Sequence, residues 1–226
     1  MLLALNTCGN TASVALGRVT ADDLKILSLA TLATRTYSAQ LIPEIAELLA
    51  SQSATMADVE AIVVVNGPGS FTGIRVGLST AKGLAEAAEI PLIAVSRLAL
   101  LAYASGLPHV LTAVDAGRGD YYVGEYRNGE NLGEALLSGE ETVATAKRPN
   151  AGVVVCDEST SGEGATACAA LAICGPLYVQ PPDAADAIRF ALPRFRARQF
   201  ENAATLEANY LRRSDAEVVL ASRVTA

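Results

Sequence analysis

The segment from Ala61 to Glu89 constrains the fold of this chain more than any other. It opens with AIVVV, an unbroken run of apolar and mostly β-branched residues that is typical of a strand buried on both faces. A loop dense in glycine follows, and good helix formers then continue until Pro91. A strand, a tight loop and a helix in this order predict a parallel crossover within an α/β sheet.

The segments on either side complete a first lobe. Ser38 is predicted to cap a helix whose apolar residues recur at a spacing of one, four, seven and eight, which puts them on one helical face. The predicted strands are 2–5, 13–19, 24–32, 61–65 and 92–95, and the predicted helices are 38–50, 73–89 and 96–104. This half has the order βββαβαβα, a meander followed by parallel crossovers.

The second half repeats this order less clearly. Strands are predicted at 110–114, 121–126, 132–137 and 153–156, and helices at 140–147 and 183–200, the latter interrupted near Pro193. We therefore expect an α/β protein of two lobes, each with a mixed sheet. The N-terminal lobe is residues 1–106, and the shorter C-terminal lobe is residues 107–226, whose last helix packs back on the first lobe. Actin-like and sugar-kinase-like ATPases are built from such a duplicated order.

The glycine-dense loop reads NGPGSFTG. Its glycines permit positive φ or a close backbone approach, and either Ser70 or Thr72 can cap the following helix. The loop lacks the G-K-[ST] of a P-loop, so two interpretations stay open: an anion site at the helix N-terminus or a structural turn. The candidate motif loop consists of Gly67, Pro68, Gly69, Ser70, Phe71 and Thr72.

The helix after this loop carries small residues four positions apart. Such a stripe lets another element approach closely, either a partner's helix or the protein's own sheet. Charged residues beside the stripe are suited to orient a partner. Together with the apolar face of the preceding helix, they form a candidate partner interface of Leu41, Ile42, Ile45, Leu48, Leu49, Gly73, Arg75, Gly77, Thr80, Ala81, Lys82 and Ala85.

Composition excludes several function classes. The net charge of −7 argues against a stand-alone RNA binder, and one histidine rules out sites built on paired histidines. His109 is expected to be structural, and the four cysteines, without C-x-x-C spacing, to be buried reduced thiols. We predict a cytoplasmic protein, because no apolar run approaches the roughly 20 residues that span a bilayer.

The sequence resembles the TsaB family, also called YeaZ. The resemblance rests on GPGSFTGIRVGLSTAKGLA at 67–85, with further agreement in LLALNT, SAQLIPEIAELL, IPLIAVSRLALLA, DAGRGDYYVGEY and ANYLRR. It is strong over the first 126 residues and rests on length and order between 127 and 206.

This resemblance implies a two-lobed actin-like fold (ASKHA, ribonuclease H-like) without its own catalytic, cofactor or metal site. Members pair with TsaD, which holds the metal and transfers threonylcarbamoyl to tRNA, and the ATPase TsaE joins them. The chain would thus be a non-catalytic activator that meets tRNA within the complex. Its two leading helices would contact TsaD, or a second copy of the chain when it is alone.

Two positions bear on the alternative of an ATPase or small-molecule kinase. Asn6 stands where the family usually has an Asp, and active members of the superfamily use that Asp to hold Mg²⁺. Asp115 lies where these ATPases place a second acidic residue, although the favoured interpretation is a turn residue at a strand end before Gly117. A protease, the third alternative, would need a histidine beside a nucleophile.

Overall fold

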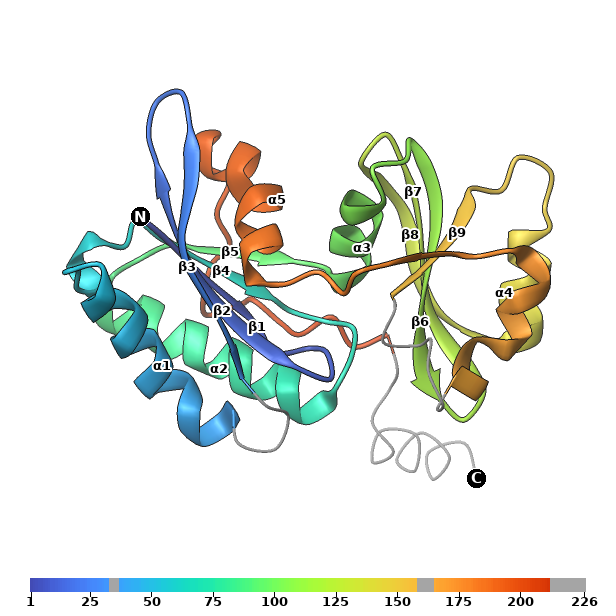
Figure 1. The fold of residues 1–226 in the computed structure, drawn as a ribbon, viewed down its shortest axis with the longest axis horizontal. Helices are drawn as coiled ribbons and strands as arrows, with labels where there is room; N and C mark the ends of the chain where they lie inside the picture. The colour runs from blue at the N-terminus through green and yellow to red at the C-terminus, as the bar shows by residue number, and fades with distance from the viewer. Residues whose placement is uncertain (33–36, 158–164, 212–226) are drawn as a thin grey trace.

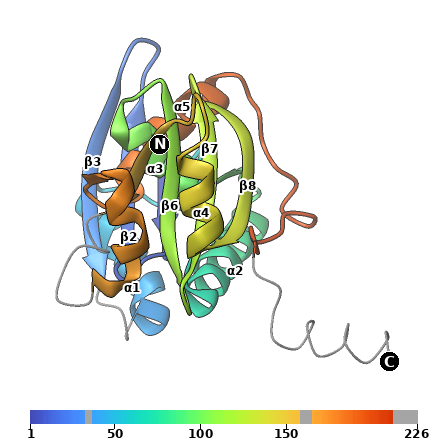
Figure 2. The ribbon, with the colours of Figure 1, turned by 90° about the vertical axis from the view of Figure 1, so that its right-hand side faces the viewer.

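The computed structural model describes residues 1–32, 37–157 and 165–211, which form two five-stranded sheets with helices on their faces (Figures 1 and 2). The elements are β1 (Leu2–Asn6), β2 (Ala12–Val19), β3 (Leu24–Leu32), α1 (Tyr37–Ser51), η1 (Met56–Asp58), β4 (Ala61–Val65), α2 (Phe71–Ala88), β5 (Leu92–Val95), α3 (Arg97–Ser105), β6 (His109–Gly117), β7 (Asp120–Arg127), β8 (Glu130–Ser138), α4 (Gly139–Ala146), β9 (Val153–Asp157), η3 (Ala165–Cys174), β10 (Leu177–Val179) and α5 (Ala184–Arg196).

The first sheet has the order β3-β2-β1-β4-β5. β1, β2 and β3 pair antiparallel, whereas β1, β4 and β5 pair parallel, so the sheet is mixed as predicted. Because side chains alternate along a strand, Leu3 and Leu5 enter the core under α1 and α2, and Leu2 and Ala4 enter the core under α5. Helices thus cover both faces of this sheet.

The second sheet, β10-β9-β6-β7-β8, repeats the pattern. β6, β7 and β8 pair antiparallel, and β6, β9 and β10 pair parallel. One face packs against α4 and η3, and the other face packs against α3. The two-lobed α/β fold is therefore confirmed.

The helix that closes each repeat packs on the sheet of the other repeat. α3 follows β5 along the chain but contacts β6, β7 and β9, whereas α5 follows β10 but contacts β1, β2, β4 and β5 (Figure 1). The C-terminal half of the chain consequently returns to the first sheet.

The predicted boundaries hold except at a few places. α1 begins at Tyr37, so Ser38 is its second residue and not its cap. α5 runs through Pro193 and ends at Arg196, with Asp183 as its N-cap. The 3₁₀ helix η3 takes the place of the second helix expected from an exact repeat.

Candidate partner surface and the junction that supports it

The motif loop joins three segments that are distant in sequence. The Asn66 carbonyl accepts a hydrogen bond from Asn209 N at 2.8 Å, and the Gly67 carbonyl accepts one from Arg97 N at 2.6 Å. Ser70 N donates to the Cys8 carbonyl at 3.0 Å. The loop therefore holds together the β1–β2 turn, the start of α3 and the C-terminal segment.

One glycine of the motif loop and one glycine of α2 are required by close packing. A Cβ on Gly69 would lie 2.2 Å from the Cys8 carbonyl oxygen, and one on Gly77 would lie 2.2 Å from Thr7 Oγ1. Ser70 caps α2 by accepting from Gly73 N at 3.2 Å, and the Thr7 hydroxyl donates to the Gly73 carbonyl at 2.6 Å. These contacts support the structural interpretation of the loop over the anion site.

The candidate interface divides into a buried part and an exposed part. The expectation that all twelve side chains face a partner has to be corrected. Eight of them lie on the inner sides of α1 and α2 and are buried. The small-residue stripe packs on the protein's own sheet, the second of the two possibilities left open by the sequence. The buried residues are Leu41, Ile45, Leu48, Leu49, Gly73, Gly77, Ala81 and Ala85.

Four predicted residues remain accessible on the outer side of the two helices. Ile42 is 51% exposed, Arg75 is exposed, and Thr80 and Lys82 are half-buried. α1 and α2 contact each other, so these side chains belong to neighbouring helices. We refer to them as the outer α1–α2 face, and their role as a partner interface stays a prediction.

An aromatic stack that the sequence did not reveal borders this face. The Arg75 guanidinium lies 3.7 Å from the centroid of the Phe71 ring, and Arg75 Nε donates to the Tyr210 hydroxyl at 3.0 Å. The two rings are 5.4 Å apart, and both are exposed. Tyr210 belongs to the ANYLRR segment, whose resemblance to relatives was the only signal that could have pointed to it.

Two polar bridges connect the sheets. Arg97 Nη2 contacts the fully buried Asp157 carboxylate at 2.7 Å, and its Nη1 reaches the Cys8 carbonyl at 3.4 Å. Glu134 on β8 accepts hydrogen bonds from Ser96 at 2.5 Å, from Asn209 at 2.6 Å and from the Tyr126 hydroxyl. Burial raises the pKa of Tyr126, and the negative charge of the nearby Glu134 carboxylate raises it further. The phenol therefore stays a proton donor.

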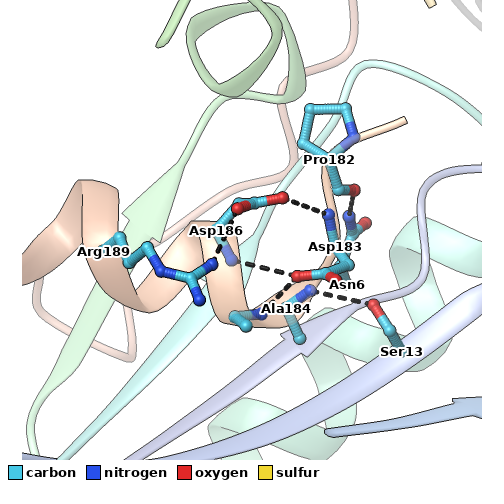
Figure 3. Close-up of polar contacts among 8 residues, drawn as sticks. Asn6, Ser13, Pro182, Asp183, Ala184, Asp186 and Arg189 are labelled. Carbon is cyan, nitrogen blue, oxygen red and sulfur yellow. Dashed lines mark hydrogen bonds and ion pairs between the residues drawn. The ribbon is translucent and has the colours of Figure 1, made fainter. Parts of the chain in front are cut away.

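Asn6 has a structural role at the N-terminus of α5 (Figure 3). Its Nδ2 donates to the Pro182 carbonyl at 2.9 Å, and its Oδ1 accepts from Cys8 N at 3.2 Å. Nearby, Ser13 Oγ accepts from Ala184 N at 2.9 Å, which satisfies the first N–H of the helix. The amide of Asn6 thus provides a donor that a carboxylate could not.

Other candidate catalytic residues also have structural partners. Asp115 Oδ1 accepts from Gly117 N at 3.0 Å, which supports its interpretation as a turn residue. His109 Nε2 lies 2.9 Å from a Glu125 oxygen, which gives the ring the partner that the structural interpretation expects. Burial raises the pKa of the Cys8 thiol to about 12, so the reactive thiolate is disfavoured. Within residues 1–32, 37–157 and 165–211, no cluster of three or more metal-ligating side chains occurs.

A helix that crosses a bilayer needs roughly 20 predominantly apolar residues. Across the described part of the chain, no helix combines the length and the apolar character needed to cross a membrane.

Comparisons with known proteins agree with one another. The family model described as TsaD, tRNA N6-adenosine threonylcarbamoyltransferase, matches residues 29–220. TsaB of Escherichia coli is 35% identical over 65% of this chain and 62% of its own length. TsaB of Haemophilus influenzae is 38% identical over 54% of this chain and 51% of its own length. TsaB of Buchnera aphidicola is 30% identical over 65% of this chain and 69% of its own length. The chain thus spans between about half and about two thirds of these relatives.

Among solved structures, YeaZ from Pseudomonas aeruginosa superposes with a TM-score of 0.73 at 27% identity, over 93% of this chain and 99% of that one. A second Pseudomonas aeruginosa structure, described as similar to the peptidase YeaZ, gives 0.72 at 26% identity with the same coverage.

Two mixed sheets of the same strand order, bridged by polar contacts and by exchanged helices, define an actin-like protein of two lobes. The sequence matches narrow this class further. The chain belongs to the family that the TsaD model describes. Its curated relatives place it more narrowly in TsaB (YeaZ), a family of tRNA threonylcarbamoyladenosine biosynthesis.

Proposed function

We propose that this chain is a non-catalytic subunit that activates a TsaD-type threonylcarbamoyl transferase. The observation that carries the proposal is the outer α1–α2 face, where Ile42 of α1 presents an apolar side chain that is 51% exposed and where Thr80 and Lys82 of the contacting helix α2 are partly accessible. An exposed apolar residue and a charged residue on two contacting helices are suited to pack against a partner's helix.

The polar groups that could catalyse a reaction support a non-catalytic role. Asn6, Asp115 and His109 each bind another part of the protein, and the Cys8 thiol is buried. A nucleophile or base engaged in this way would need a rearrangement before it could reach a substrate.

The proposal extends to the other members of the assembly. The ATPase TsaE joins the pair, tRNA is contacted within the complex, and the isolated chain forms a homodimer through the same face. The protein acts in the cytoplasm. It needs no cofactor of its own.

Co-purification with TsaD, followed by a tRNA modification assay with and without this chain, tests the proposal. Ile42→Glu should weaken the pair by at least about tenfold, because a charge would enter an apolar contact. Leu132→Glu is the matched control, since Leu132 is 48% exposed on β8, a strand of the second sheet. Normal TsaD binding by Ile42→Glu, or modification of tRNA by this chain alone, would contradict the proposal.

A further inference from the structure

A pocket with basic and aromatic walls lies at the C-terminal end of α5. Its volume is about 460 Å³, and its walls come from the last turn of α5, the segment that follows, and the residues just before β4 and β5. It is lined by Glu60, Pro91, Phe195, Arg196, Arg198 and Phe200.

Two arginines give this pocket an unbalanced positive charge. Arg196 and Arg198 are exposed, and neither guanidinium has a hydrogen-bond or ion-pair partner among the residues that the structure describes. Acidic groups nearby are already neutralised: Glu60 contacts the N-terminal ammonium at 2.6 Å, and Glu201 contacts Arg194 at 2.5 Å. A local excess of two cations therefore stands out in a chain of net charge −7.

Helix stability explains only part of this charge. Cations in the last turn of a helix interact favourably with its carbonyl end, which accounts for Arg194 and Arg196. Arg198 lies beyond the helix, and its φ of +54° belongs to the helix end itself, where Arg198 N donates to the Phe195 carbonyl at 3.0 Å and Gln199 N to the Arg194 carbonyl at 2.9 Å. Its side chain takes no part in these bonds, so the guanidinium is available to a ligand.

The aromatic wall indicates which ligand. The Phe200 ring is 37% exposed, and its centroid lies 6.4 Å from that of the partly buried Phe195. Guanidinium groups bind phosphates, and an exposed ring stacks on a base. A nucleotide within a single-stranded RNA segment combines both chemistries.

We propose that Arg196, Arg198 and Phe200 form an RNA subsite through which this chain itself contacts the tRNA of the complex. This inference rests on the proposed function and adds a residue set to it. α5 covers the face of the first sheet opposite to α1 and α2, so the helix that carries Arg196 and the outer α1–α2 face lie on opposite sides of that sheet (Figure 1).

The test measures tRNA binding by the complex assembled with TsaD, using fluorescence anisotropy over a series of salt concentrations. In the double variant Arg196→Glu/Arg198→Glu, affinity should fall at least about tenfold, and the slope of log K against log salt should fall by about 1.4 to 1.8, the loss of two phosphate contacts. Phe200→Ala should weaken binding without changing the slope.

Arg127→Glu/Lys147→Glu is the matched control, because it reverses two exposed charges, one on β7 and one directly after α4. It should leave both the affinity and the slope unchanged. Size-exclusion chromatography first establishes that each variant still binds TsaD. If the wild-type chain forms no complex with TsaD, the proposed function is contradicted. If the Arg196→Glu/Arg198→Glu variant forms an intact complex whose tRNA affinity and salt slope are unchanged, the RNA subsite is overturned.

Two further outcomes would also overturn it. One is an equal loss of tRNA affinity in the control pair, which would mean that only the net charge matters. The other is binding of the wild-type chain to anionic lipid vesicles, abolished by Arg196→Glu/Arg198→Glu, with no effect of that variant on tRNA.

Discussion

Gly77→Ala tests whether α2 is held against the first sheet by the contact with Thr7. The new Cβ would lie 2.2 Å from Thr7 Oγ1 and 3.3 Å from both Cβ and Cγ2 of that residue. Thr7 is buried and its hydroxyl donates to the Gly73 carbonyl at 2.6 Å, so it cannot move away without losing that hydrogen bond.

The magnitude follows from three terms. Overpacking a core by one methyl group costs about 1 to 3 kcal/mol. Loss of the Thr7 hydrogen bond adds about 1 kcal/mol. The helix propensity of alanine over glycine returns about 1 kcal/mol. We therefore expect Gly77→Ala to destabilise the fold by about 1 to 3 kcal/mol.

Gly83→Ala in the same helix is the matched control. Nothing lies within 4 Å of a Cβ at Gly83, so this variant should be more stable than the wild type by up to about 1 kcal/mol. Urea denaturation followed by circular dichroism compares the midpoints at equal m. In a double-mutant cycle with Thr7→Ala, the cost of Gly77→Ala should shrink. Equal stability of the two glycine variants would refute the reasoning.

Three further predictions concern the rest of the fold. Asn6→Asp should destabilise the protein by about 1 to 3 kcal/mol in urea denaturation at neutral pH, since the Pro182 carbonyl would lose its donor, and by less at acid pH, where the protonated carboxyl can donate. Burial raises the pKa of Cys8 from 9.0 to about 12, so between these values the unfolded chain has released a proton that the folded chain retains. Stability measured by urea denaturation should therefore fall by up to about 1.4 kcal/mol per pH unit as pH rises above 9.0, and Cys8→Ala should flatten this slope. Residues 1–106 alone should fail to fold cooperatively by circular dichroism, because α5 would no longer cover the first sheet; a cooperative thermal transition of this fragment would contradict that expectation.

Local patterns were sufficient to predict most elements of this fold. The strand at 61–65 and the helices on either side of it have apolar residues at the period of their own structure, and periodicity is a local property. η3 and β10 escaped prediction because the Ala-rich region 165–179 has no clear period. The exchange of α3 and α5 depends on contacts between the two halves of the chain, which periodicity does not encode.

The candidate site was less predictable for the same reason. A stripe of small residues permits close approach but does not specify what approaches, and here the decision depends on Thr7 at the end of β1. Arg97 and Asp157 are single charges at the ends of their elements, so no spacing in the sequence could pair them. Ile42 lay on the predicted apolar face, yet it is the member of that face that remains exposed.

The exchanged helices bear on how this molecule could work. α3 and α5 each follow one sheet along the chain and pack on the other, so the chain crosses between the two sheets at each of these helices. A rotation between the sheets would strain these two crossings and the polar bridges at Arg97 and Glu134. We expect such a structure to resist the opening and closing on which a two-lobed catalyst depends. A subunit that acts by presenting a helix face needs that face in a constant position. Two crossings and two polar bridges would hold the outer α1–α2 face in place while the far end of α5 stays free for a second ligand.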